Sequence, residues 1–326
     1  MNSSKFVFGF EFQGRGEVTE RDIIVGSIML ALSLTAVILG STNLVIIYRS
    51  TIFHSAFGWF WATRTSSEIV SNAVHVVYSA PVTLLQPQGI PPIIPVLTYL
   101  IMNSSAFLAC MIHQAVSTNR FIAVFLPHRY KFIFTKRRCV MIVLSLSIPV
   151  VAFDIAYIAV PCNLVGYGPT KYENVFATCE PHFHRNYSPI VASLYQFCFV
   201  VCAATIFTDS ATLLKILHMR FAQNSIKQDI YSSRDIRFFA QSSVQNISMI
   251  LTSLSVLLAG STYRGDDDAW RISGLSMIIV THICNALALI FFNPEVRKQF
   301  FATVCGRTTT TVVVASTNSN MMQRKR

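Results

Sequence analysis

The chain has 326 residues, of which 52% are hydrophobic and only 13% are charged, and its net charge is +11. Soluble domains contain about 25% charged residues, so this composition excludes an ordinary soluble enzyme. Apolar runs of about twenty residues recur along the chain and are long enough to cross a lipid bilayer, which predicts a polytopic membrane protein.

The elements predicted in chain order are all helical. Residues 1–21 are polar and aromatic without the apolar core of a signal peptide, so an extracellular N-terminal segment precedes the first span. Seven membrane spans follow, over residues 22–48, 58–85, 95–125, 138–160, 188–217, 237–261 and 271–292. A short amphipathic eighth helix over 294–302 completes a seven-helix domain of residues 22–302, and a flexible cytoplasmic tail covers 303–326. The predicted fold class is an all-α membrane protein, a seven-transmembrane helix bundle.

The distribution of Lys and Arg between the connecting segments predicts the orientation of the bundle. One set of segments holds most of them, including Lys136, Arg137 and Arg138 after the third span. The other set carries acidic residues, including three consecutive Asp at 266–268. Because basic segments stay in the cytoplasm, the N-terminus is expected outside and the C-terminus inside. This arrangement resembles that of a G-protein-coupled receptor and is opposite to that of the inverted seven-span insect odorant channels.

Polar residues inside two predicted spans indicate which helix faces turn inward. The second span carries Arg64, Glu68 and Asn72, and the sixth begins with several Gln, Ser and Asn residues, so these spans are the least apolar. Such side chains are costly against lipid and are expected to face the bundle interior. Arg64 and Glu68 are four residues apart and share a helix face, where they can neutralise each other. The pair has two interpretations, a structural ion pair or a role in coupling near the cytoplasmic end.

The most specific motif closes the third span, where Asn119-Arg120-Phe121 is followed by Pro127 and Tyr130. It resembles the rhodopsin-like receptor pattern D-R-Y-x-A-[VI]-x-x-P-x-x-Y, with Asn for Asp and Phe for Tyr. In that family the Arg is restrained at rest and faces the G protein when active, which implies that Arg120 and its four motif partners take part in coupling. Because Asn119 replaces Asp, no adjacent carboxylate is available to hold Arg120. A simple anchor at the membrane interface is the alternative role of this Arg.

Two further Asn residues match weaker receptor patterns. Asn43 closes a Gly-Ser-Thr-Asn sequence similar to the receptor G-x-x-N pattern, whose Asn bonds to neighbouring helices. Asn285 stands where the N-P-x-x-Y pattern of the seventh span begins, although Ala286 and Leu289 replace its Pro and Tyr. With the polar residues of the second span, both are expected to join a polar network in the bundle. Cys305, beyond the eighth helix, is a palmitoylation candidate, with an unmodified thiol as the alternative.

The second span connects these motifs to one receptor family. It opens with Phe-Gly-Trp-Phe-Trp-Ala-Thr-Arg over 57–64 and ends with Ala-Pro-Val-Thr-Leu over 80–84. Together with the third-span motif, this resembles the nematode serpentine chemoreceptors of class X (Srx), over about residues 35–301. The resemblance implies a receptor in the plasma membrane of sensory neurons, expected in their cilia. Its implied partners are a small environmental molecule as ligand and a heterotrimeric G protein.

The outer segments contain candidate modification sites. Of the eight cysteines, only Cys162 and Cys179 fall in an outer loop, where the compartment is oxidising. An intraloop disulfide between them is predicted and would stabilise the loop by about 3 kcal/mol, with two free thiols as the alternative. Asn2 and Asn186 begin Asn-X-Ser sequons in segments assigned outside and are candidate glycosylation sites.

A ligand is expected to bind between the outer ends of the helices. Asp154, in the outer half of the fourth span, has no charged residue within one helical turn, so it should bond to a polar group on another helix or remain protonated. It is one pocket candidate. The others are outer-half aromatic residues and one histidine, namely Tyr78, Tyr99, Tyr157, Tyr195 and His282. Packing or interfacial placement is the alternative role of the aromatic residues.

Two other functional classes fit the sequence less well. A ligand-gated channel or transporter would line a pathway with Arg64, Glu68 and Asp154, but the sequence has neither an inverted repeat nor paired broken helices. A membrane enzyme is not expected, because the His residues are scattered and HExxH, GxSxG and phosphate-binding Gly motifs are absent. No cofactor, metal or nucleic-acid partner is predicted, and the sequence does not indicate an oligomeric state.

Overall fold

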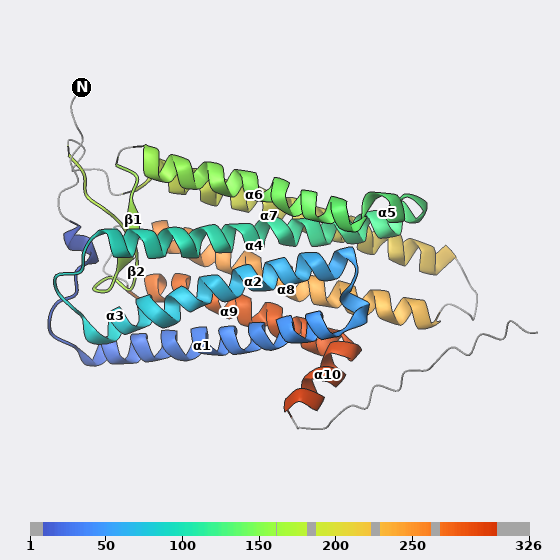
Figure 1. The fold of residues 1–326 in the computed structure, drawn as a ribbon, viewed down its shortest axis with the longest axis horizontal. Coiled ribbons are helices and arrows are strands. Elements are labelled where there is room, and N and C mark those ends of the chain that lie inside the picture. Colours follow the sequence, from blue (N-terminus) through green and yellow to red (C-terminus); the bar gives the residue numbers. More distant parts are fainter. Residues whose placement is uncertain (1–8, 161, 181–186, 223–228, 262–267, 305–326) are drawn as a thin grey trace, which may run out of the picture.

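The computed structural model describes residues 9–160, 162–180, 187–222, 229–261 and 268–304. Within these ranges, seven long helical segments run side by side (Figure 1). They are α1 (Glu20–Arg49), α2 with its continuation α3 (Ala56–Val74 and Ala80–Leu85), α4 (Ile93–Phe125), α6 (Lys136–Ala159), α7 (Pro189–Ala222), α8 (Asp229–Ser261) and α9 (Asp268–Phe292). The structure also contains the short helices α5 (Pro127–Ile133) and α10 (Pro294–Val304) and the strands β1 (Val165–Gly168) and β2 (Glu173–Phe176). The predicted seven-helix bundle with a short eighth helix is confirmed.

The polarity of the long helices follows the pattern expected from the sequence. Five of them, α1, α4, α6, α7 and α9, are long and apolar enough to cross a membrane, counting only the described residues. α2 and α8 are the two predicted spans with the most polar side chains. Their Arg64, Glu68, Gln241 and Gln245 are buried inside the bundle. The polar faces therefore turn away from the surface that lipid would cover.

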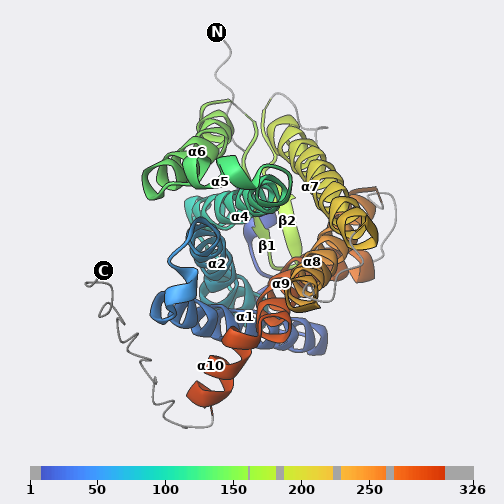
Figure 2. The same cartoon turned by 90° about the vertical axis from the view of Figure 1, so that its right-hand side faces the viewer.

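α4 runs through the middle of the bundle and packs against α2, α6 and α7, as the view along the helices shows (Figure 2). α6 lies at the periphery, and only 11% of its most apolar stretch is buried. Its exposed side chains include Leu144, Ile148 and Ile155, which are suited to contact with lipid. α4 therefore contacts three other long helices from its central position.

The two ends of the bundle differ in structure and in charge. The hairpin of β1 and β2 lies at one end with the N-terminal segment, and α5 and α10 lie at the other (Figure 1). The basic residues Arg129, Lys131, Arg138, Arg297 and Lys298 belong to α5, α10 or the start of α6. Because cytoplasmic segments are enriched in Lys and Arg, the end with α5 and α10 is the cytoplasmic one.

The second span is not one regular helix. α2 passes into a π-helical turn over His75–Ser79 before it continues as α3. Pro81 follows this turn and has no backbone N–H to donate to the carbonyl of Val77, so the regular hydrogen-bond ladder cannot continue there. Single π turns inside α-helices occur frequently at functional sites. This one changes the direction of the side chains at the outer end of the span, including Tyr78.

Two glycines allow the chain to approach itself closely at the inner half of the bundle. A Cβ on Gly58 would lie 1.8 Å from the carbonyl oxygen of Phe53, which only Gly avoids without moving the backbone. A Cβ on Gly40 would lie 2.9 Å from a side-chain carbon of Ile69, so this Gly lets α1 pack tightly on α2. The Phe-Gly motif at the start of the second span thus has a local structural cause.

A buried carboxylate ties the N-terminal segment to the outer ends of the helices. Asp22 is fully buried and accepts hydrogen bonds from Gln86 Nε2 (2.7 Å) and the Tyr172 hydroxyl (2.8 Å). It also forms an ion pair with Arg15 and caps its own helix through Thr19. Burial raises the pKa of the Tyr172 phenol, so it stays protonated and donates to Asp22. The Tyr172 hydroxyl and the Asp22 charge raise the pKa of Arg15.

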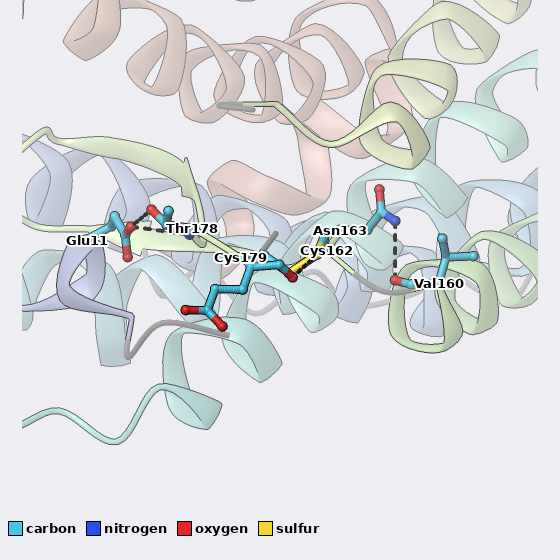
Figure 3. The surroundings of a disulfide bond; sticks show 7 residues. Glu11, Val160, Cys162, Asn163, Thr178 and Cys179 are labelled. Carbon is cyan, nitrogen blue, oxygen red and sulfur yellow. Dashed lines mark hydrogen bonds between the residues drawn. A yellow bond between two sulfur atoms is a disulfide. The ribbon is translucent and has the colours of Figure 1, made fainter. Parts of the chain in front are cut away.

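A disulfide closes the outer loop that carries the hairpin. Figure 3 shows the bond between Cys162 and Cys179, the pairing that the sequence predicts. Next to it, the Glu11 carboxylate accepts from the backbone N–H of Thr178 (3.2 Å) and from its hydroxyl. The four residues of β1 are all buried, and β1 packs against α4. Residues 9–19 and this hairpin lie together at the outer end of the bundle (Figure 1).

Some elements differ from the sequence-based expectations. Residues 127–133 and 165–176 form α5 and the hairpin, for which the sequence predicts no secondary structure. α8 begins at Asp229, whereas the predicted span begins at residue 237, because a helix can extend beyond the apolar segment that crosses the membrane. The predicted modification sites Asn2, Asn186 and Cys305 lie outside the described residues.

Candidate functional site

A buried ion pair forms the start of a polar network at the centre of the bundle. Arg64 Nε donates to Glu68 Oε1 over 3.0 Å, and Asn285 Nδ2 donates to the same oxygen over 2.8 Å. Arg64 is 2% exposed and Glu68 is 6% exposed, so neither charge has access to solvent. An unpaired charge at this depth would be strongly destabilising, and the two side chains neutralise each other. Asn285 thus joins the pair, which lies on α2, to α9.

A histidine carries the network from α2 to α4 and α8. Arg64 Nη1 lies 2.6 Å from His113 Nδ1, and His113 Nε2 lies 3.0 Å from Asn246 Oδ1. Because Arg can only donate, Nδ1 must accept, and the ring proton is assigned to Nε2. His113 is 1% exposed. Its ring accepts a hydrogen bond from Arg64 and donates one to Asn246.

The network ends on a second buried carboxylate, in α7. Asn246 Nδ2 donates to Asp209 Oδ2 over 2.9 Å, and Ser117 Oγ donates to Asp209 Oδ1 over 2.7 Å. Asp209 is 4% exposed. We refer to Asn285, Glu68, Arg64, His113, Asn246, Asp209 and Ser117 as the interhelical network. It connects α9, α2, α4, α8 and α7 without a break, so a movement of one of these helices changes bonds on the others.

The Arg of the third-span motif lies beside the end of this network. Arg120 is one helical turn beyond Ser117 on α4, and its guanidinium carbon lies 5.5 Å from the centre of the Phe57 ring. Asp209 is close enough to attract it electrostatically. Arg120 Nε and Nη2 are buried without a hydrogen-bond partner in the part of the chain that the structure describes. Arg120 therefore has a nearby charge of opposite sign but no direct ion pair within those residues.

The other motif residues lie at the cytoplasmic end of α4. Asn119 Nδ2 donates to the Tyr130 hydroxyl over 3.3 Å, which ties α4 to α5. Pro127 occupies the first turn of α5, where its missing N–H has no cost, and the Phe121 ring stacks on Phe125. The motif after Arg120 thus encodes the break between α4 and α5.

The family model of the serpentine type 7TM GPCR chemoreceptor Srx matches residues 30–293 of the chain. The match covers most of α1 and all of the other six long helical segments, and it includes the whole interhelical network. The chain belongs to the Srx family of chemoreceptors. A comparison with curated proteins gives no match. As a member of this family it is a multi-pass membrane receptor rather than an enzyme.

Two further Asn residues of the Srx receptor bond to the helices that carry the network. Asn43 Nδ2 donates to the backbone carbonyl of Ala286 over 3.0 Å, which joins α1 to α9. Asn72 Nδ2 lies 2.7 Å from both the Glu68 carbonyl oxygen and His282 Nδ1. Asn285 therefore bonds to the carboxylate of Glu68. Glu68 lies one helical turn from Asn72 toward the cytoplasm.

The predicted pocket residues of the receptor occupy different environments. Asp154 accepts from Ser104 on α4 over 2.7 Å, so it has a polar partner on another helix, which is one of the two alternatives that the sequence left open. The rings of Tyr99 and Tyr157 lie 5.8 Å apart, and the Tyr157 hydroxyl donates to the backbone carbonyl of Val165 in β1. Tyr78 and His282 are buried, whereas Tyr195 is 41% exposed. Of these six residues, Tyr78 and His282 lie nearest to the network along their helices.

Sequence reasoning did not identify four members of the network as site residues. They are His113, Ser117, Asp209 and Asn246. Each is a polar or charged residue inside a predicted span, which was a sufficient signal to expect an inward-facing partner. Asp209 and Asn246 are on different helices, however, and the sequence gives no rotational position for one helix relative to another.

Proposed function

We propose that this receptor binds an environmental small molecule between its outer helix ends and activates a heterotrimeric G protein at its cytoplasmic face. We place it in the plasma membrane of sensory neurons, in their cilia. Residues 1–21 are extracellular in this proposal, residues 22–302 form the receptor domain and residues 303–326 form the cytoplasmic tail. In the resting state the cytoplasmic end is closed around Arg120, and ligand shifts a two-state bundle toward an open form.

The observation that carries this proposal is the continuity of the interhelical network from Asn285 to Asp209. Asn72 connects this network to His282 on the outer side, and Asp209 lies beside Arg120 on the inner side. The network has discrete hydrogen bonds that must be exchanged when helices move, which is the property of a two-state element. Asn119, Arg120, Phe121, Pro127 and Tyr130 form the G-protein-facing end in this proposal.

The channel or transporter alternative places Arg64, Glu68 and Asp154 along one pathway. Arg64 and Glu68 bond to each other and to neighbours in α4 and α9. Asp154 instead bonds to Ser104 at the contact between α4 and α6. The three side chains thus belong to two separate sets of contacts, which favours the receptor.

A signalling assay in cells tests the proposed function. Surface-expressed wild type and Arg120→Ala are exposed to a panel of volatile and water-soluble nematode cues, and dissociation of the G-protein subunits is recorded together with whole-cell current. Arg49→Ala, which removes an exposed Arg at the end of α1, is the matched control. We expect a G-protein response that Arg120→Ala abolishes at unchanged surface expression. A current that needs no G protein and survives Arg120→Ala would replace the receptor mechanism with a channel.

A further inference from the structure

A row of buried polar groups lies above the interhelical network on α2 and its π turn. Ser71, His75 and Tyr78 follow one another along the span at intervals of four and three residues. They are 0%, 1% and 8% exposed. The Ser71 hydroxyl, both His75 ring nitrogens and the Tyr78 hydroxyl have no hydrogen-bond partner in the described ranges of the chain.

Such groups are unusual because burial without a hydrogen bond is unfavourable. Each buried donor or acceptor that lacks a partner costs about 1–3 kcal/mol, so a run of them in a folded protein requires an explanation. The π turn over His75–Ser79 is an independent feature of the same segment, and such turns are frequent at functional sites. Both observations point to a binding position at the outer part of the second span.

Asn72 and His282 connect this position to the network. The Asn72 amide nitrogen bonds to the Glu68 carbonyl and to His282 Nδ1, which leaves Asn72 Oδ1 without a partner among the described side chains. Because the amide nitrogen can only donate, His282 Nδ1 accepts. His75 and His282 are also close enough to interact electrostatically. An occupant that bonds to Asn72 or His75 therefore acts within one or two side chains of Glu68.

The surroundings define the chemistry of the occupant. The hydrophobic cluster at this level contains Val74 and Tyr78 from the same span together with Met102 and Ile279 from α4 and α9. The nearest carboxylate in the network, Glu68, is already paired with Arg64 and is therefore not free to bind a charged ligand. Hydroxyl and imidazole groups can both donate and accept, which suits a ligand oxygen in an apolar setting.

We propose that Ser71, His75 and Tyr78 form the polar side of a site for a small uncharged ligand, an alcohol or a ketone, whose oxygen bonds within this row and whose alkyl part packs against the surrounding apolar side chains. This inference rests on the proposed receptor function and names its ligand class. The ligand supplies part of the hydrogen bonding that the protein leaves unmade, and its binding is transmitted through Asn72 to the interhelical network.

Photolabelling of the purified full-length receptor tests the position directly. The probe is an alkyl-diazirine alcohol, the competitors are hexanol and hexanone, and hexane is the control competitor. We expect saturable labelling of residues 71–78 or of the facing part of α9, reduced by hexanol and hexanone and not by hexane. Labelling confined to the lipid-facing side of α6, or insensitive to the oxygenated competitors, would overturn the proposal.

Substitutions separate a binding role from a structural one. Tyr78→Phe and Ser71→Ala remove only hydroxyl groups, and Tyr48→Phe at an 84% exposed position is the matched control. We expect each of the two to weaken competition by hexanol about three- to tenfold and to leave the ligand-free receptor equally or more stable. Loss of thermal stability without weaker competition would show that these hydroxyls bond within the protein. Cue-evoked G-protein activation is recorded in parallel, because its absence in wild type with every cue tested contradicts the receptor function itself, whereas unchanged competition refutes only the assigned position.

Discussion

Replacing the two charges of the Arg64–Glu68 pair separately and together gives a quantitative test of the network. Glu68→Leu leaves the Arg64 charge buried without its counter-ion, and Arg64→Met leaves the Glu68 charge. Breaking a buried pair from one side costs about 3–5 kcal/mol, whereas replacing both partners by apolar residues is often close to neutral. The double variant also leaves Asn285 and His113 each short of one hydrogen bond, at about 1–3 kcal/mol each. We therefore expect the double variant to be no less stable than either single variant.

The expected numbers follow from these contacts. Independent effects would sum to about 6–10 kcal/mol, so a double variant that loses only about 3–5 kcal/mol implies a coupling energy of roughly 3 kcal/mol or more. At about 2 °C per kcal/mol, each single substitution lowers the melting temperature by roughly 6–10 °C. The assay is the thermal unfolding of the detergent-solubilised receptor followed by fluorescence-detected size exclusion. Arg49→Met, at an exposed Arg on α1, is the control and should change little.

The same variants decide between the two interpretations of the pair. If Arg64 and Glu68 are only structural, the double variant is expressed no less than either single variant and keeps its basal G-protein activation. We expect expression no lower than that of the single variants with altered activation, because the double variant also breaks the bonds to Asn285 and His113 that continue the network. Additive losses in the double variant would show that the two charges do not stabilise each other, and the reasoning would be wrong.

Three other substitutions test separate parts of the structure. Asn119→Asp places a carboxylate next to Arg120, and we expect it to lower ligand-free nucleotide exchange about fivefold, equivalent to about 1 kcal/mol. An exchange rate per surface receptor equal to that of wild type would contradict this. Gly58→Ala forces a Cβ to within 1.8 Å of the Phe53 carbonyl oxygen and should abolish surface expression, whereas Gly40→Ala meets only a flexible side chain and should reduce it less; equal amounts of both variants at the surface would refute the argument. Asp22→Asn removes the charge that Arg15 and Tyr172 bond to and should lower stability by about 1–3 kcal/mol, and an unchanged melting curve would show that these contacts of Asp22 do not stabilise the receptor.

The sequence predicts those features that depend on spacing along one helix or loop. Arg64 and Glu68 are four residues apart, so their pairing needs no knowledge of other helices, and the structure shows the ion pair. Cys162 and Cys179 are the only cysteines of the outer loop, and the structure joins them. The apolar runs likewise give the helices to within a few residues at most ends.

The features that the sequence does not predict depend on contacts between helices. Asp209 and Asn246 are visible as polar residues inside spans, but their pairing depends on how α7 and α8 are rotated. Asn72 occupies the middle of the second span, yet Glu68 is the residue that reaches Asn285, because the register between α2 and α9 is set by packing. The hairpin forms from short segments whose polarity is uninformative and whose pairing is held by the disulfide and by α4.

Nucleotide exchange on a purified heterotrimeric G protein, catalysed by the purified receptor in lipid nanodiscs, tests the central claim most directly. No other membrane protein is present, so any acceleration comes from this chain. We expect that wild type accelerates exchange, that an active cue increases the rate further and that Arg120→Ala abolishes both effects while the melting temperature is unchanged. Exchange at the uncatalysed rate with every G-protein subtype and cue tested, from a folded wild-type receptor, would contradict it.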